Sequence, residues 1–455
     1  MKNGKRSSFS GKLGYVLAAA GASVGLGNIW RFPYLAAKYG GGIFLIIYIV
    51  LALTFGYTMI VAETAIGRMT RKSPVGAFKS FGKKKWLSFG GWINAVIPVL
   101  IVPYYSVIGG WVIKYLVEYF RGNAKLLAED GYFTDFISNG VSTELCFMAF
   151  CAFTLIIIFA GVQNGIERVS KIMMPILIVL SVIIAVYSVT RPGALAGVKY
   201  FLVPNVKNFS WMTVVSAMGQ MFYSLSIAMG ILITFGSYMK KDTAIEDSTR
   251  NVEIFDTGIA IMAGLMIIPA VFAFSGGDPD TIQAGPSLMF ITIPKVFQNM
   301  GFGTVIGIVF FLLVLFAAVT SSIALTESAV STFEDELGWG RKKATVLVGV
   351  IMLALGSLSS LGYGPLAGIK IIGMQFLDLF DFLTNSVMMP IAALLTSLLV
   401  SRVVGIDKIE DEIIHGESAF RRKKVFVVMI KYLCPVFAII ILLSSVANAL
   451  GWIKM

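Results

Sequence analysis

Long apolar runs separated by short polar segments dominate the chain from residue 13 onward. A helix needs about 17–25 mainly apolar residues to cross a bilayer. This pattern predicts an all-α integral membrane protein with eleven transmembrane helices. The runs lie near residues 13–37, 41–66, 87–113, 145–164, 166–190, 210–239, 253–275, 301–333, 343–365, 374–401 and 428–451.

Two of these runs contain residues that interrupt a helix. The first carries GASVGLGNIWRFP at residues 21–33, and the sixth carries FYSLSIAMG at residues 222–230. Glycine costs about 1 kcal/mol and proline about 3 kcal/mol in a helix interior. Backbone groups freed inside a bilayer need a cavity or a ligand. The two breaks therefore predict a binding site near the middle of the membrane, although small residues also let membrane helices pack closely.

The first and sixth runs occupy the same place in two halves of five helices each. This arrangement predicts a 5+5 inverted repeat with broken helices 1 and 6. The predicted parts are an N-terminal tail, a first repeat, a second repeat, and a loop with the eleventh helix. They cover residues 1–12, 13–190, 191–401 and 402–455.

Composition supports a membrane location, since 57% of the residues are hydrophobic and 14% are charged. The formal net charge of +12 comes largely from the N-terminal tail and from every second connection. Loops rich in Lys and Arg stay in the cytoplasm. We therefore expect a multi-pass protein of the cell inner (plasma) membrane with its N-terminus inside and its C-terminus outside. Membrane lipid is an expected partner, whereas a nucleic acid or an obligatory protein partner is not.

The residue types limit the chemistry. His415 is the only histidine, and the three cysteines have no metal-ligand spacing. No P-loop is present. The sequence therefore predicts neither an enzyme nor an ATP-driven pump.

Side-chain oxygens favour a cation site instead. LFAAVTSSIAL at residues 315–325 brings Thr320, Ser321 and Ser322 together. Hydroxyls beside backbone carbonyls can enclose a small hard cation, although they can also bond their own helix. Asp256 lies inside the seventh run, where a carboxylate is costly to bury and usually functional.

The motifs, taken in order, resemble the neurotransmitter:sodium symporter family with the LeuT fold. They are GASVGLGNIWRFP followed by GGG, then YYSVIGGW, FYSLSIAMG, AVTSSIAL and FLDLFDF. The resemblance covers nearly the whole chain. Eleven helices resemble the short prokaryotic branch that includes multi-hydrophobic amino acid and tyrosine transporters.

The resemblance implies two Na⁺ sites. The first would use the substrate carboxylate, the Ser23 carbonyl and the side chains of Asn28, Ser224 and Asp256. The second would use the carbonyls of Gly21, Val24 and Ala317 and the hydroxyls of Thr320 and Ser321.

Asp256 departs from the asparagine that many members of the family carry. A fixed negative charge here would replace the anion that chloride-dependent members borrow. Ala260, one turn later, is neutral where some relatives keep a glutamate. We therefore expect no requirement for chloride.

The resemblance also implies a pocket for an amino acid. Its carboxylate would meet the amides of Leu26 and Gly27 and the hydroxyl of Tyr105. Its amino group would meet carbonyls around Ala22, Tyr223 and Ser226. The side-chain pocket would be lined by Ile101, Ile108, Tyr223, Met229 and Leu325, with Ser321 beside it.

No charged residue lines this expected pocket, which favours a hydrophobic or aromatic substrate. The thioether of Met229 would give an adaptable wall that suits several substrates. A simple packing role for Met229 is the alternative.

The family pattern places gates and supporting residues around this site. Arg31 and Asp381 would close the outer side, and Arg6 and Asp335 with Phe9 and Tyr238 would close the inner side. Gly165 and Pro175 resemble a motif that unwinds the fifth helix, although an ordinary kink is an alternative. Glu63 would support the broken sixth helix. Glu327 has no role that the sequence indicates.

The sequence thus predicts a sodium-coupled symporter that imports hydrophobic or aromatic amino acids by alternating access. One alternative is a proton-coupled transporter of the same fold, with Asp256 or Glu327 carrying the proton. A substrate-gated channel or a membrane sensor is another.

Overall fold

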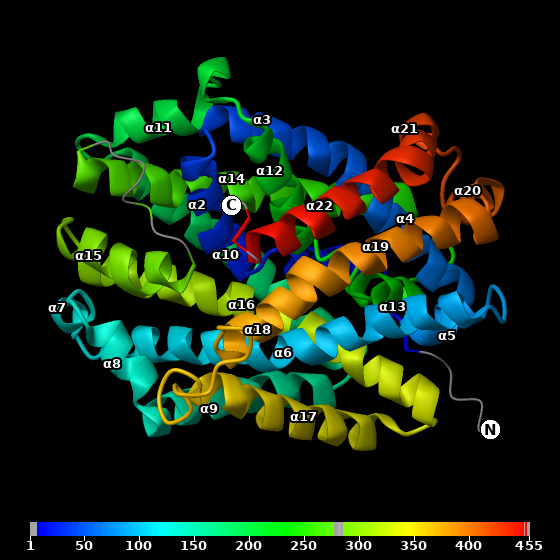
Figure 1. Cartoon of the computed structure of the whole chain (residues 1–455), viewed down its shortest axis with the longest axis horizontal. Helices are drawn as coiled ribbons and strands as arrows, with labels where there is room; N and C mark the ends of the chain where they lie inside the picture. The colour runs from blue at the N-terminus through cyan, green and yellow to red at the C-terminus, as the bar shows by residue number, and fades with distance from the viewer. Residues whose placement is uncertain (1–6, 277–281, 283–284, 450, 453–455) are drawn as a thin grey trace.

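The computed structural model describes residues 7–276, 282, 285–449 and 451–452. Its secondary structure within these ranges is helical, apart from two isolated β-bridges. The helices run mostly along the long axis of the molecule (Figure 1).

Nine helices in the described ranges are long and apolar enough to cross a membrane. Five of them are single helices: α6 (Lys85–Phe120), α9 (Gly140–Phe159), α14 (Ile245–Ser275), α16 (Gly303–Leu337) and α17 (Arg341–Leu361). Two more consist of α3 (Gly42–Leu51), η2 (Ala52–Gly56) and α4 (Tyr57–Thr70), and of η3 (Val162–Glu167) and α10 (Arg168–Val189). The last two consist of α18 (Phe376–Asp381), η7 (Phe382–Met388), α19 (Met389–Leu398) and η8 (Leu399–Val404), and of α21 (Lys423–Val428), η9 (Met429–Leu433) and α22 (Cys434–Ala449).

The first predicted span is broken. Three residues separate helix α1 (Lys12–Ser23) from η1 (Gly27–Arg31), which continues into α2 (Phe32–Lys38). The two parts are bent by 52°. The bend coincides with the glycines at positions 25 and 27, so the interruption lies where the sequence predicts it.

The sixth predicted span is also interrupted. Helix α12 (Trp211–Ser224) and helix α13 (Ile231–Tyr238) are separated by residues 225–230. The nine long helices and the bent pair α1 and α2 make ten spans in the described ranges, and α12 with α13 would bring the total to eleven. The total of eleven stays a prediction.

Several helix ends differ from the apolar runs. Helix α6 continues to Phe120, and α14 begins at Ile245. These helices extend beyond their apolar runs into segments with polar and charged residues, so hydropathy alone does not predict the additional turns. The fifth span begins at Val162, because Gly161 has a φ of 90° and separates it from α9.

Helix α1 lies in the interior of the bundle. Residues 14–23 are all buried, and α1 packs against α10, α14 and α16. A helix that is apolar on all sides is suited to such a position. The break at its end is consequently enclosed by protein and not by lipid.

Short helices cover the two ends of the bundle. One end carries α7 (Ala124–Leu127), α8 (Tyr132–Ser138) and α15 (Ile293–Gln298), and the opposite end carries α5 (Pro74–Lys79) and α20 (Ile406–Ile414) (Figure 1). The remaining short elements are α11 (Ala194–Leu202), η4 (Val206–Asn208) and η6 (Leu288–Thr292).

Candidate functional site

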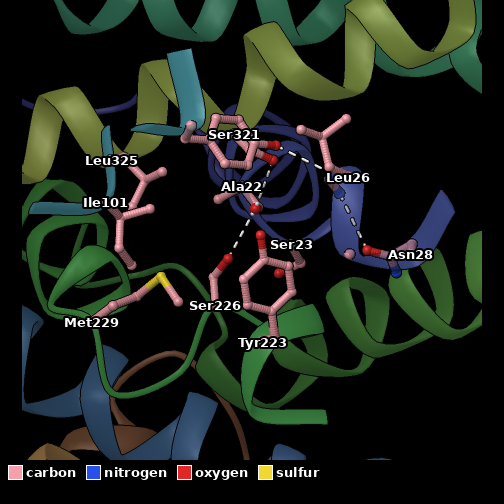
Figure 2. A pocket seen from close by; sticks show the side chains of 13 residues that line it. Ala22, Ser23, Leu26, Asn28, Ile101, Tyr223, Ser226, Met229, Ser321 and Leu325 are labelled. Atoms are coloured by element: carbon pink, nitrogen blue, oxygen red, sulfur yellow. Dashed lines mark hydrogen bonds between the residues drawn. The ribbon is translucent and has the colours of Figure 1, made fainter. Parts of the chain in front are cut away.

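A pocket lies between the two helix breaks, with about 360 Å³ of space not filled by atoms. It is lined by Ala22, Ser23, Gly25, Leu26, Gly27, Asn28, Ile101, Tyr105, Tyr223, Ser226, Met229, Ser321 and Leu325. Figure 2 shows Ile101, Met229 and Leu325 together on one side, away from Leu26 and Asn28. The pocket therefore has an apolar part and a polar part, and none of the described residues that line it carries a charged side chain.

The structure brings together ten of the eleven residues expected to bind the substrate. The exception is Ile108, which instead lines a second, larger cavity on the side that is predicted to be outward, called here the outer cavity. Gly25 lines the pocket although the sequence did not single it out. Its small size is needed here, because a Cβ atom at Gly25 would lie 2.7 Å from Oγ of Ser321.

The segment after the first break presents backbone amides to the pocket. The amide of Leu26 donates a hydrogen bond to the hydroxyl of Tyr105 at 3.3 Å. The first amides of a helix lack helical partners and attract negative charge. Close approach of Tyr223 requires glycine at position 27, since a Cβ atom there would lie 2.2 Å from the ring.

Gln220 supports this segment, although no motif in the sequence singled it out. Its Nε2 atom donates a hydrogen bond to the carbonyl of Gly27 at 3.0 Å. Gln220 is fully buried in α12. The first turn after one break is thus held by the helix that precedes the other break.

The second helix break has an unusual backbone. Ser226 and Ala228 have φ values of 52° and 59°, and Gly230 has a φ of 72°. Left-handed backbone is uncommon for residues other than glycine. Glu63 accepts a hydrogen bond from the amide of Ala228 at 2.7 Å. Its carboxylate thereby satisfies an amide in the segment that the resemblance assigned it to support.

A cluster of oxygen atoms surrounds Ser321 beside the first break. The Ser321 hydroxyl lies within hydrogen-bonding distance of three carbonyl oxygens, those of Gly21 at 3.2 Å, Ala22 at 3.1 Å and Val24 at 3.4 Å. One hydroxyl proton cannot serve all three carbonyls together. The surplus of acceptors suits a cation.

Thr320 lies next to this cluster. Its hydroxyl is 3.1 Å from the carbonyl oxygen of Ala317. A Cβ atom at Gly21 would lie 3.1 Å from Cβ of Thr320, so the two helices are in close contact. The structure therefore gathers the five residues expected for the second Na⁺ site, and oxygen ligands are those that a hard cation prefers.

Asp256 forms a second cluster of oxygen atoms. Its carboxylate accepts hydrogen bonds from Asn28 at 2.8 Å, from Ser224 at 2.8 Å and from Tyr48 at 2.9 Å. Asp256 is fully buried. Among the described residues, no lysine, arginine or histidine nitrogen lies within 4.0 Å of it.

A buried carboxylate without a positive partner is costly. A bound cation would offset that cost. Ser23 is the remaining residue expected here, through its carbonyl. Its hydroxyl lies within hydrogen-bonding distance of the carbonyl oxygens of Ala19 and Leu225, at 3.1 and 3.3 Å.

The outer cavity shares Tyr223 with the pocket and has about 1630 Å³ of space not filled by atoms. Arg31 and Asp381 both line it, yet they form no direct ion pair in the part of the chain that the structure describes. Arg31 lies over the ring of Tyr223, 5.4 Å from its centre. Asp381 accepts hydrogen bonds from Tyr104 at 3.2 Å and from Asn385 at 2.6 Å. The predicted outer-gate charges thus face one cavity without closing it directly.

Aromatic side chains pack together on the side that is predicted to be inward. Phe9 is buried, and its ring makes edge contacts with Tyr15, Phe235 and Tyr238 at centre distances of 5.6 to 6.0 Å. The amide of Phe9 also donates to the carbonyl of Tyr238 at 3.0 Å. Phe9 and Tyr238 therefore lie together, as the predicted inner gate requires.

A charged residue other than the predicted pair Arg6 and Asp335 contacts Tyr238. Arg6 lies outside the described residues, and Asp335 accepts the amide of Ser73 at 2.7 Å. The hydroxyl of Tyr238 donates to Glu327 at 2.7 Å, and Arg341 donates to both oxygens of Glu327 at 3.0 and 2.5 Å. Glu327, which had no role from the sequence, is the fully buried acceptor of this network.

Gly165 and Pro175 lie in the same span. Gly165 is part of the π-helical segment η3, where a Cβ atom would lie 2.1 Å from the carbonyl oxygen of Ile157. Pro175 lies inside the continuous helix α10. The span is irregular at Gly165 and continuous around Pro175.

Comparisons with known proteins agree with this arrangement. The profile described as the sodium:neurotransmitter symporter family matches residues 6–129 and 133–452. An uncharacterized sodium-dependent transporter of Bacillus subtilis (strain 168), YhdH, is 34% identical over 98% of this chain and 99% of its own length. The human sodium- and chloride-dependent GABA transporter 2 is 26% identical over 90% of this chain and 75% of its own.

A solved structure is similar along the whole chain. The crystal structure of MhsT in complex with L-phenylalanine superimposes with a TM-score of 0.86 at 34% identity. The match covers 97% of this chain and all of the other.

Proposed function

The chain belongs to the sodium:neurotransmitter symporter family, and we propose that it imports hydrophobic or aromatic amino acids together with Na⁺ and without chloride. It has the LeuT fold and is a sodium-dependent, multi-pass membrane transporter of a family that is not a family of enzymes. The proposal adds the substrate class, the ion sites and the direction of transport.

The pocket itself supports the substrate class. Its apolar part is formed by Ile101, Met229 and Leu325, and its polar part by the amides and carbonyls at the two breaks. The carboxylate of an amino acid fits at the amides of Leu26 and Gly27, and an apolar side chain fits the opposite wall. The complex of MhsT with L-phenylalanine is consistent with such a ligand.

The two oxygen clusters provide a physical route to coupling. At the first site, a Na⁺ ion beside Asp256 would offset the buried carboxylate and bind the carboxylate of the substrate. At the second site, a Na⁺ ion would join α1 to α16 through the carbonyls around Ser321. Each ion would favour the conformation that has the complete site, so Na⁺ binding shifts the population between the alternating states.

Asp256 also supports transport without chloride. Its carboxylate is a fixed negative charge held by Tyr48, Asn28 and Ser224. Ala260, one turn further along α14, is buried and neutral. A second anion beside this carboxylate would be repelled.

We also propose the orientation and the repeats. The basic tail and the basic connections favour a cytoplasmic N-terminus and an outer C-terminus in the inner (plasma) membrane. Residues 13–190 and 191–401 would form the two repeats, with one break in each.

Equilibrium binding to the purified protein tests this proposal. We expect labelled phenylalanine, tryptophan, tyrosine and leucine to bind in NaCl and in sodium gluconate, and not in KCl. Labelled glutamate and lysine serve as charged controls and should not bind. Binding that is equal in KCl and NaCl would contradict the sodium sites, and binding lost in gluconate would contradict the role of Asp256.

A further inference from the structure

The connection between α17 and α18 forms a tight hairpin. Residues 368–375 read GIKIIGMQ. Ile371 and Met374 exchange both of their backbone hydrogen bonds, each with an N to O distance of 3.0 Å. The turn between them therefore consists of only two residues, Ile372 and Gly373.

The residue at the tip of this hairpin does not suit the turn. Ile372 has a φ of 54° and Gly373 has a φ of 77°. Two-residue turns with positive φ at both positions favour Asn-Gly, and a β-branched residue with positive φ is an outlier. Asparagine would serve the turn better in water. A strained outlier of this kind indicates that the side chain itself has a use.

The isoleucines of the hairpin have no place in the protein interior. Ile372 is 78% exposed, Ile369 is 50% exposed and Ile371 is 43% exposed. The space around the hairpin is open, since a Cβ atom at Gly368 or Gly373 would meet nothing within 4 Å. Lys370, between the isoleucines, is exposed as well.

The hairpin stands beside an outward-facing apolar surface. A Cβ atom at Gly140 would lie 3.0 Å from Pro365, so the start of the connection packs on the first residue of α9. Just beyond this contact, Val141 is 73% exposed and Leu145 is 62% exposed. Only 39% of the apolar window of α9 and 44% of that of α17 are buried in the protein. Figure 1 shows the connection projecting at one end of α17, beside α9.

We propose that Ile369, Ile371 and Ile372 insert into the bilayer leaflet on the side of the outer cavity. Lipid acyl chains would contact the exposed side chains of Val141 and Leu145, and they would also cover the apolar tip of the hairpin that the protein leaves exposed. The ammonium group of Lys370 would then reach the phosphates of the headgroup layer. This inference concerns a lipid contact and does not depend on the identity of the substrate.

The anchor has a consequence for the outer gate. Met374, at the base of the hairpin, lines the outer cavity, and α18 with Asp381 follows at once. A hairpin held in the bilayer would fix the start of this helix relative to the membrane surface.

Spin labels on single introduced cysteines test the proposal. The variant Ile372→Cys, labelled in nanodiscs of phosphatidylethanolamine and phosphatidylglycerol, should be more accessible to oxygen than to a water-soluble nickel chelate. The matched control is Glu129→Cys, which is exposed between α7 and α8 and should show the reverse order. The unmodified protein, treated with the same label, measures any background from its three native cysteines.

A second position keeps the test independent of one variant. Ile369→Cys should give the same order as Ile372→Cys, with oxygen favoured. A label at residue 372 that is as accessible to nickel as the label at residue 129 would overturn the proposal. Dipolar coupling between two labels at residue 372, with protection from both reagents, would assign the surface to a second copy of the chain and would overturn it equally.

Discussion

The hydroxyl of Tyr48 lies 2.9 Å from Oδ2 of Asp256, and it donates a hydrogen bond to that buried carboxylate. Ser224 and Asn28 donate to Oδ1 of the same group, each at 2.8 Å. The carboxylate is therefore held in one orientation by three neutral donors. Its remaining acceptor capacity suits a cation, which is the basis of the proposed first sodium site.

We expect Asp256→Asn to raise the Na⁺ concentration for half-maximal amino acid binding by about 10-fold or more. A hydrogen bond or ligand contact to a charged group contributes roughly 1.5–3 kcal/mol, and 1.4 kcal/mol is tenfold in affinity. Sodium titrations of substrate binding measure this change. Tyr48→Phe keeps the charge and removes one donor, so its shift should be smaller. An unchanged sodium dependence in Asp256→Asn would contradict the site.

The ion pair between Glu327 and Arg341 should stabilise the folded protein. Glu327 is fully buried and Arg341 is about one-fifth exposed. Removing one partner of a buried pair typically costs about 3–5 kcal/mol, because the other charge is left without compensation. We therefore expect Arg341→Gln to lower thermal stability strongly, and Glu327→Gln combined with Arg341→Gln to recover part of the loss. Additive effects in this double-mutant cycle would show that the pair is not coupled.

Glu63 should matter chiefly as an acceptor for the unwound segment. In Glu63→Leu the buried amide of Ala228 loses its partner, which should cost roughly 1–3 kcal/mol. Glu63→Gln keeps an acceptor oxygen of similar size and is the matched control. The unfolding temperature in detergent measures both variants. Equal temperatures for Glu63→Leu and the unmodified protein would show that the hydrogen bond contributes nothing.

Ala228 should gain stability when it is replaced by glycine. Left-handed backbone costs roughly 1–2 kcal/mol for residues with a Cβ atom. Glycine also has greater freedom in the unfolded chain, which destabilises the folded state by about 0.4–1 kcal/mol and offsets part of the gain in stability. Ala263→Gly, at an equally buried position in the regular helix α14, should instead lose about 1 kcal/mol. A loss of stability in Ala228→Gly similar to that in Ala263→Gly would contradict the strain at position 228.

The sequence predicted both helix breaks from residues that interrupt a helix inside an apolar run. Residues 21–33 contain three glycines and a proline, and the sixth run contains Gly230 together with the hydroxyls of Ser224 and Ser226. Residues 225–230 and the segment around Gly25 lie where those patterns occur. The expected pocket residues came from the family resemblance and not from the apolar pattern, and ten of the eleven line the pocket.

Residues farther along a helix were harder to place. Ile101, Tyr105 and Ile108 lie on one face of α6, but seven residues of helix rise about 10.5 Å. Ile108 consequently lies in the outer cavity and not in the pocket. Arg341 was not recognised as the partner of Glu327, because the chain reverses between α16 and α17. Hydrophobic periodicity does not show which side chains meet after such a reversal.

The most direct test of sodium-coupled amino acid import is accumulation of labelled tryptophan, tyrosine and leucine in proteoliposomes. We expect concentrative uptake under an inward sodium gradient, with or without chloride, and none when potassium replaces sodium. Uptake driven by a proton gradient without sodium would contradict it and would make Asp256 a proton carrier. Flux that follows sodium but never accumulates the amino acid would indicate a channel instead.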